Sequence, residues 1–161
     1  MEWHVLSKYL DDVTAKIGTD RSKVRLLVGS VGNGREMTES NCDHGYDKPE
    51  CYSSTGARFS VMDGGQFVTE FYLCQFPGCC AFCISTGVYV VDKLRGKGIN
   101  TLTNKLRQHI AEAAGYTALI CTDAIKNIPE RKTLAKNGWL DVYTCNNRRT
   151  GNDVAISIKG L

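Results

Sequence analysis

The chain has 161 residues, of which 42% are hydrophobic and 23% are charged, and its formal net charge is +3. This length and composition are typical of one globular domain with one core, and the modest charge argues against a nucleic-acid-binding protein. No apolar run is long enough to span a bilayer, and the first residues do not resemble a signal peptide, so we expect a cytoplasmic protein without a membrane partner.

The first third of the chain predicts a helix, a short buried element and a long loop. Residues 8–17 have the apolar spacing of a short amphipathic helix. The run Val24–Val28 is compatible with a strand or with the buried end of a helix. Residues 29–56 are rich in Gly, Asn, Asp and Ser, and we predict a long variable loop there.

A hairpin and a further strand follow. Residues 57–62 and 66–74 flank Asp63-Gly64-Gly65, a sequence typical of a tight hairpin turn. The next strand is predicted over residues 79–91, which end in the β-branched and aromatic run Gly87-Val88-Tyr89-Val90-Val91.

A basic glycine loop, Arg95-Gly96-Lys97-Gly98-Ile99-Asn100, separates this strand from a predicted helix. The helix is indicated by apolar residues at spacings of three and four, namely Ile99, Leu102, Leu106, Ile110 and Ala113, and by Gly115 at its end. Backbone N–H groups and the helix dipole favour an anion at such a point, and Arg95 and Lys97 add counter-charge. The loop therefore predicts a ligand that carries phosphates.

The spacing excludes two other phosphate-binding loops. The P-loop pattern G-x-x-x-x-G-K-[ST] is absent, and Thr101 stands where a dinucleotide fingerprint needs its third glycine. Downstream, residues 116–121 predict a buried strand. A short helix then follows Asn127, with Pro129 in its first turn and Gly138-Trp139 at its end.

The glycine loop and the segment from Asn127 to Trp139 together resemble the GCN5-related N-acetyltransferases, the GNAT superfamily. Arg95 and Gly98 match that family's Gln/Arg-x-x-Gly-x-Gly/Ala pattern, whereas Asn100 departs from it at the last position. The resemblance covers roughly the second half of the chain. The compact size and the cysteine content also resemble divergent GNAT-like proteins encoded by bacteriophages.

The resemblance implies a single α/β domain over residues 1–161, with a mixed, mostly antiparallel sheet flanked by helices. It implies acetyl-CoA as acyl donor and an amine of a small molecule or a protein as acceptor. The donor-binding residues that it implies are Arg95, Gly96, Lys97, Gly98 and Asn100 at the pyrophosphate, Val90 at the thioester and Asn127 at the pantetheine arm. The loop over residues 29–56 would belong to the acceptor side.

Two catalytic groups that are frequent in this family are missing. Leu134 stands at the place of the usual acid, a tyrosine, and residues 79–91 contain no carboxylate to act as base. Amide formation still needs a proton carrier. Glu70 on the neighbouring strand, Asp123 and Tyr143 are the candidates, and His44 titrates in a useful range.

The missing acid and base leave a second hypothesis open, a GNAT-fold protein that has lost catalysis and serves in binding or assembly. A third hypothesis is a small zinc-stabilised nucleic-acid-binding module, in which Cys42, His44, Cys51, Cys80 and Cys83 supply the ligands. We expect no metal, because Cys80 and Cys83 would lie on opposite faces of one strand. Mostly buried free thiols are the expected state of the eight cysteines.

Overall fold

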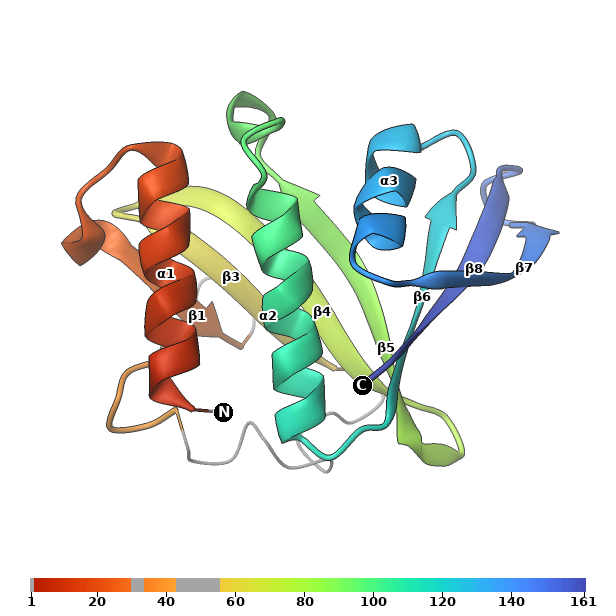
Figure 1. The fold of residues 1–161 in the computed structure, drawn as a ribbon, viewed down its shortest axis with the longest axis horizontal. Helices are drawn as coiled ribbons and strands as arrows, with labels where there is room; N and C mark the ends of the chain where they lie inside the picture. Colours follow the sequence, from red (N-terminus) through yellow and green to blue (C-terminus); the bar gives the residue numbers. More distant parts are fainter. Residues whose placement is uncertain (1, 30–33, 43–55) are drawn as a thin grey trace.

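The computed structural model describes residues 2–29, 34–42 and 56–161, which fold around one eight-stranded sheet with three α-helices (Figure 1). The helices are α1 (Trp3–Ile17), α2 (Ile99–Ala113) and α3 (Ile128–Lys136), with the 3-10 turns η1 (Arg21–Lys23) and η3 (Asp92–Leu94). The strands are β1 (Val24–Val28), β2 (Arg35–Glu36), β3 (Ala57–Asp63), β4 (Gln66–Phe76), β5 (Cys79–Val90), β6 (Ala118–Ala124), β7 (Leu140–Asn146) and β8 (Asp153–Gly160). No helix in these ranges is long and apolar enough to cross a membrane.

The strand order is β2-β1-β3-β4-β5-β6-β8-β7. Neighbouring strands run antiparallel throughout the described sheet except for β5 and β6, which run parallel because α2 connects them. The expected mixed, mostly antiparallel sheet in a single α/β domain is therefore confirmed.

The sheet splits where β5 meets β6. Only a short segment near the beginning of each strand is paired: Phe82–Ile84 of β5 lies opposite Ala118–Ile120 of β6. Beyond that point β5 stays paired with β4 as far as Val90, whereas β6 stays paired with β8 as far as Ala124. Their carboxyl ends consequently diverge, as the separating arrows in Figure 1 show. This opening, next to the start of α2, is where the fold can admit a ligand.

The described helices lie on one face of the sheet in Figure 1. Helix α1 packs on β1 and α2, α2 lies across β4, β5 and β6, and α3 packs beside α2. Between helices and sheet lies one apolar core, in which Phe59 of β3 and Phe71 of β4 stack with ring centroids 4.9 Å apart. The apolar stripe of α2 faces this core through Leu106 and Ile110, as its spacing predicts.

Two local predictions differ from the structure, and one alternative that the sequence left open is decided by it. Helix α1 begins at Trp3 rather than at residue 8, because Leu6 continues the buried stripe toward the N-terminus. The run Val24–Val28 is a strand and not a helical end, since it pairs with β2 and β3. Within the loop predicted over residues 29–56, Arg35–Glu36 forms the short strand β2; residues 30–33 and 43–55 lie outside the described ranges.

Candidate functional site

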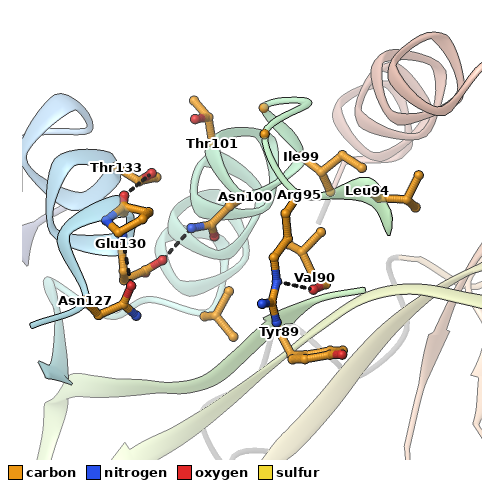
Figure 2. Close-up of a pocket in the computed structure, with 14 residues that line it drawn as sticks. Tyr89, Val90, Leu94, Arg95, Ile99, Asn100, Thr101, Asn127, Glu130 and Thr133 are labelled. Carbon is orange, nitrogen blue, oxygen red and sulfur yellow. Dashed lines mark hydrogen bonds between the residues drawn. The ribbon is translucent and has the colours of Figure 1, made fainter. Parts of the chain in front are cut away.

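A cleft of about 470 Å³ opens where β5 and β6 separate. Its walls are the end of β5, the loop that leads into α2, and the first two turns of α3 (Figure 2). Six of the seven predicted donor-binding residues line it, namely Val90, Arg95, Gly96, Gly98, Asn100 and Asn127; Lys97 belongs to the same loop without lining the cleft.

The glycine loop has a backbone that other residues rarely adopt. Gly96 and Gly98 have φ angles of 79° and 81°, in the left-handed region that favours glycine. Gly98 is also the N-cap of α2, and this cap provides no side-chain acceptor for the N–H groups of the first helical turn. A Cβ added at Gly96 would meet nothing within 4 Å, so the loop backbone is open to a ligand. Unpaired N–H groups at an open helix start form an anion site.

Arg95 is anchored at the end of β5. Its Nε donates to the carbonyl oxygen of Val90 at 3.1 Å, and its Nη2 lies 2.8 Å from Oδ1 of Asp92. The guanidinium carbon lies 5.4 Å from the centre of the Tyr89 ring. Figure 2 shows the side chain extended along the wall of the cleft toward Val90. A cation is thereby held between the glycine loop and the strand end.

The backbone of Val90 faces the open side of β5. Val91 donates its N–H to the carbonyl of Val68 at 3.1 Å, and Val90 stands opposite Thr69 in the antiparallel register. Hydrogen-bonded pairs alternate along such a ladder, so the N–H and C=O of Val90 point away from β4. The Arg95 contact to the Val90 carbonyl agrees with this direction. The N–H of Val90 is therefore directed toward the side from which β6 has diverged.

Asn100 and Glu130 connect the two helices that border the cleft. Asn100, in the first turn of α2, donates its Nδ2 to a carboxylate oxygen of Glu130 in the first turn of α3 (Figure 2). Asn127 caps α3, because its Oδ1 accepts from the Glu130 N–H at 3.4 Å. Glu130 is not among the site residues predicted from the sequence. Its signal is the pattern of a capping Asn followed three residues later by Glu, which indicates a helix start and reveals nothing of a cleft.

Arg107 lies beneath this bridge and was also missed. Its side chain is 1% exposed, and its Nη2 lies 3.7 Å from the Glu130 carboxylate. Its Nη1 donates to Oγ of Ser85 on β5 at 3.2 Å, and its guanidinium stacks 5.4 Å from the centre of the Trp139 ring. Burial lowers the pKa of Arg107, and the charge of Glu130 opposes that shift. No sequence pattern indicates a buried role for Arg107, because its position on α2 is also compatible with a solvated face.

The three catalytic candidates lie on three different strands and outside the cleft lining. Glu70, on β4, stands opposite Tyr89 and forms an ion pair with Arg58, in which both side chains are less than one fifth exposed. Asp123 lies on β6, beneath α3. Tyr143 lies on the edge strand β7 and is 64% exposed. Leu134 is buried, and it is the preceding residue, Thr133, that lines the cleft.

Asp123 belongs to a polar cluster formed by side chains of β6, β7, β8 and α3. Its carboxylate accepts from Arg131 Nη1 and from Ser157 Oγ, each at 3.4 Å. Asp141 accepts from the same two side chains, at 2.5 Å from Arg131 Nη2 and 2.8 Å from Ser157 Oγ. Burial raises the pKa of Asp123 above its usual range, whereas the Ser157 hydrogen bond lowers the pKa of Asp141. Of the two carboxyls, Asp123 is thus the better proton acceptor.

Cys74, Cys79, Cys80, Cys83, Cys121 and Cys145 are free thiols. Among the described residues, no group of three or more His, Cys, Asp or Glu side chains is placed to hold a metal. Cys80 is exposed and Cys83 is buried. His44 and Cys51, two of the hypothetical zinc ligands, lie outside the described residues. Burial raises the pKa of Cys83 to about 12 and that of Cys121 to about 12, so both thiols stay protonated near neutral pH.

No protein-family model and no curated protein matches the sequence. Solved structures do match. The chain superposes on a GNAT family acetyltransferase from Elizabethkingia anophelis with acetyl-CoA bound, with a TM-score of 0.66 and 12% identity, covering 86% of this chain and 99% of that one. An IAA acetyltransferase from Bacillus cereus gives a TM-score of 0.61 and 16% identity over 86% and 99% of the two chains.

A ribosomal-protein-S5-alanine acetyltransferase from Vibrio fischeri matches 66% of this chain and 62% of its own, with a TM-score of 0.59 and 15% identity. The three superpositions have TM-scores of 0.59 to 0.66 at 12–16% identity, so a common fold is retained although the sequences have diverged. The chain therefore has the fold of the GCN5-related N-acetyltransferases.

Proposed function

We propose that the protein is an acetyl-CoA-dependent N-acyltransferase that acts on an amine of a small molecule or a protein. The observation that carries the proposal is the turn with left-handed glycines at positions 96 and 98, which opens α2 directly onto the cleft at the split in the sheet. A structural neighbour of the same fold has acetyl-CoA bound.

Each end of the cleft suits one part of the donor. The open N–H groups of the first turn of α2, with the cations Arg95 and Lys97, would hold the pyrophosphate. Asn127 uses its Oδ1 for the cap of α3, so its Nδ2 is the group that would donate to the pantetheine arm. The side-chain amide of Asn100 is hydrogen-bonded to Glu130, so the backbone N–H of Asn100 is the group that would face the phosphates.

Val90 would contact the thioester end of acetyl-CoA. Acetyl-CoA supplies the acyl group as a thioester, and the Val90 N–H, directed to the open side of β5, would donate to the thioester oxygen. The acceptor nitrogen attacks the carbonyl carbon, a C–N bond forms and the C–S bond breaks. The sulfur leaves as thiolate, and the amine proton passes to a base. Glu70, Asp123 and Tyr143 remain the proposed carriers of that proton.

The donor site is tested by calorimetric titration with acetyl-CoA. We expect binding to the wild type, and Arg95→Ala or Gly98→Val should weaken it by about 1–3 kcal/mol, because the first removes a charge-assisted hydrogen bond and the second blocks approach to the backbone. Gly78→Val is the matched control, because Gly78 has a φ of 78° and open surroundings in a distant hairpin. Absence of any heat with wild-type protein would reject the donor site.

The proton carrier is tested by release of free thiol from acetyl-CoA across a panel of amines and peptides. Among Glu70→Gln, Asp123→Asn and Tyr143→Phe, we expect one variant to slow turnover by roughly 10²–10⁴-fold, the usual contribution of a general acid or base. Turnover should rise with pH, because the neutral amine is the nucleophile. Unchanged rates in all three variants would exclude these residues.

A second function is favoured by the placement of the catalytic candidates outside the cleft lining and by the burial of Leu134. A protein of this kind would bind the donor and transfer nothing. Binding of acetyl-CoA without thiol release above background on any acceptor would establish this binding or assembly role in place of catalysis.

A further inference from the structure

The last turn of α1 lies beside the glycine loop. Helices α1 and α2 pack against each other, and Figure 1 shows the end of α1 and the start of α2 at the same end of the pair. Tyr9 of α1 shares a buried hydrogen bond of 3.2 Å with Thr103 of α2. Further along α1, Lys16 reaches the loop, because a Cβ added at Gly98 would lie 4.0 Å from the Cε of Lys16. The packing of the two helices therefore brings Lys16 to the start of α2, although Lys16 and Gly98 are far apart in the sequence.

The residue spacing along α1 explains why Lys16 faces this way. Tyr9, Val13 and Lys16 follow one another at spacings of four and three, so they share one face of the helix. Tyr9 and Val13 are buried, whereas Lys16 is exposed. The buried stripe of α1 thus ends in a charged side chain at the start of α2. A lysine in this place packs its apolar stem beside Gly98 and keeps its ammonium group in solvent.

The ammonium group of Lys16 is available for a ligand. Arg95, the first cation of the glycine loop, already pairs with Asp92 at 2.8 Å. Lys16 and Lys97 form no ion pair or side-chain hydrogen bond with the part of the chain that the structure describes. The start of α2 therefore has two unpaired positive charges beside its open N–H groups, and they come from two different elements.

A cation at this end of α1 also has an electrostatic reason. The carbonyl groups of the last turn give the C-terminal end of a helix a partial negative charge, whereas the N-terminal end has a partial positive charge. The packing of the two helices places the negative end of α1 beside the positive end of α2, where a phosphate would bind. Lys16 lies in the last turn of α1. Its charge offsets the negative end of α1, so the potential at the start of α2 stays positive.

We propose that Lys16 of α1 binds the pyrophosphate group of the acyl donor together with the start of α2. A pyrophosphate diester carries two negative charges, which matches the two unpaired lysines, Lys16 and Lys97. Lys16 does not line the cleft, so it acts on the phosphates and not on the acyl group or the pantetheine arm. The inference rests on the proposed function and adds to it, because it assigns the N-terminal helix a part in the selection of a donor with a pyrophosphate.

Calorimetric titration with two donors tests the assignment. Acetyl-CoA and acetyl-dephospho-CoA both contain the pyrophosphate, but only acetyl-CoA has the phosphate on the ribose. Lys16→Met should weaken the binding of both donors about tenfold, the lower end of the range for a hydrogen bond to a charged group, because Lys16 is exposed. Lys16→Arg retains the charge and should keep both affinities within about twofold of the wild type. A loss for acetyl-CoA alone would place Lys16 at the ribose phosphate and overturn the proposal.

Lys105→Met is the matched control. Lys105 is also exposed and lies about 10 Å further along α2, so this substitution removes the same charge and should leave both affinities at the wild-type level. At an ionic strength of about 1 M, the difference between the wild type and Lys16→Met should become smaller, because salt screens an exposed charge. A loss of affinity that is equally large at high salt would show that Lys16 supports the fold of α1 and does not bind the phosphates.

The outcomes separate this inference from the proposed function. Wild-type protein that binds neither donor would reject the donor site, and the role of Lys16 with it. If the wild type binds acetyl-CoA and Lys16→Met binds it equally well, only the role of Lys16 is rejected.

Discussion

Replacement of Arg107 by alanine is expected to lower the free energy of unfolding by about 3–5 kcal/mol, the usual cost of breaking a buried ion pair on one side. Arg107 is almost fully buried, and its guanidinium contacts Glu130, Ser85 and the Trp139 ring at once. Alanine would leave the Glu130 carboxylate without its counter-charge, and it would open a void against Trp139. Urea denaturation followed by circular dichroism measures the change.

A surface ion pair of the same type provides the comparison. Arg21 donates its Nε to Asp11 at 2.7 Å, with side chains 37% and 59% exposed, so Arg21→Ala should cost no more than about 1 kcal/mol. Substituting Arg107→Met together with Glu130→Gln should recover part of the loss, because no uncompensated charge remains. If Arg107→Ala costs no more than Arg21→Ala, the buried network does not support the fold.

The central elements could be predicted from sequence because local signals coincide there. The Asp63-Gly64-Gly65 turn, the stripe on α2 and the glycine pair at positions 96 and 98 each depend on neighbouring residues, and all three occur as expected. The shared fold with acetyltransferases follows from two short motifs at the right separation. In each of these patterns, the residues that determine the local structure lie within one element or turn, so the sequence alone is enough to predict it.

The contacts across the cleft could not be predicted in this way. Asn100 and Glu130 are thirty positions apart, and Arg107 and Ser85 are twenty-two apart, so each pair meets only once the helices have packed on the split sheet. Asn100 shows the limit most clearly. The resemblance implies Asn100 at the pyrophosphate, but it contains no sign of the hydrogen bond from the side-chain amide of Asn100 to Glu130. Exposure of β7 likewise depends on its position at the sheet edge, which no local pattern of residues 140–146 reports.

The bulge in β5 determines how the strand end meets the cleft. Thr86 pairs with Tyr72 and Tyr89 pairs with Glu70, so β5 has one residue more than β4 between these positions. Gly87, within this stretch, has a φ of 62°, and a Cβ added there would lie 2.5 Å from Cδ2 of Tyr72. The extra residue changes which backbone groups of the following residues point away from β4, and the Val90 N–H is one of them.

Gly87→Ala is therefore expected to lower the free energy of unfolding by about 2–5 kcal/mol, about 1–2 from the left-handed backbone and the rest from the overlap with Tyr72. Gly64→Ala separates the two causes, because Gly64 has a φ of 59° and nothing within 4 Å of its added Cβ, so it should show the backbone cost alone. Adding Tyr72→Ala to Gly87→Ala removes the overlapping ring.

Under conditions where the variant is still folded, acetyl-CoA affinity should fall in Gly87→Ala and stay at the wild-type level in Gly64→Ala, because only the former displaces Val90. Equal affinity in both variants would mean that the bulge is a feature of the sheet with no part in presenting Val90 to the donor.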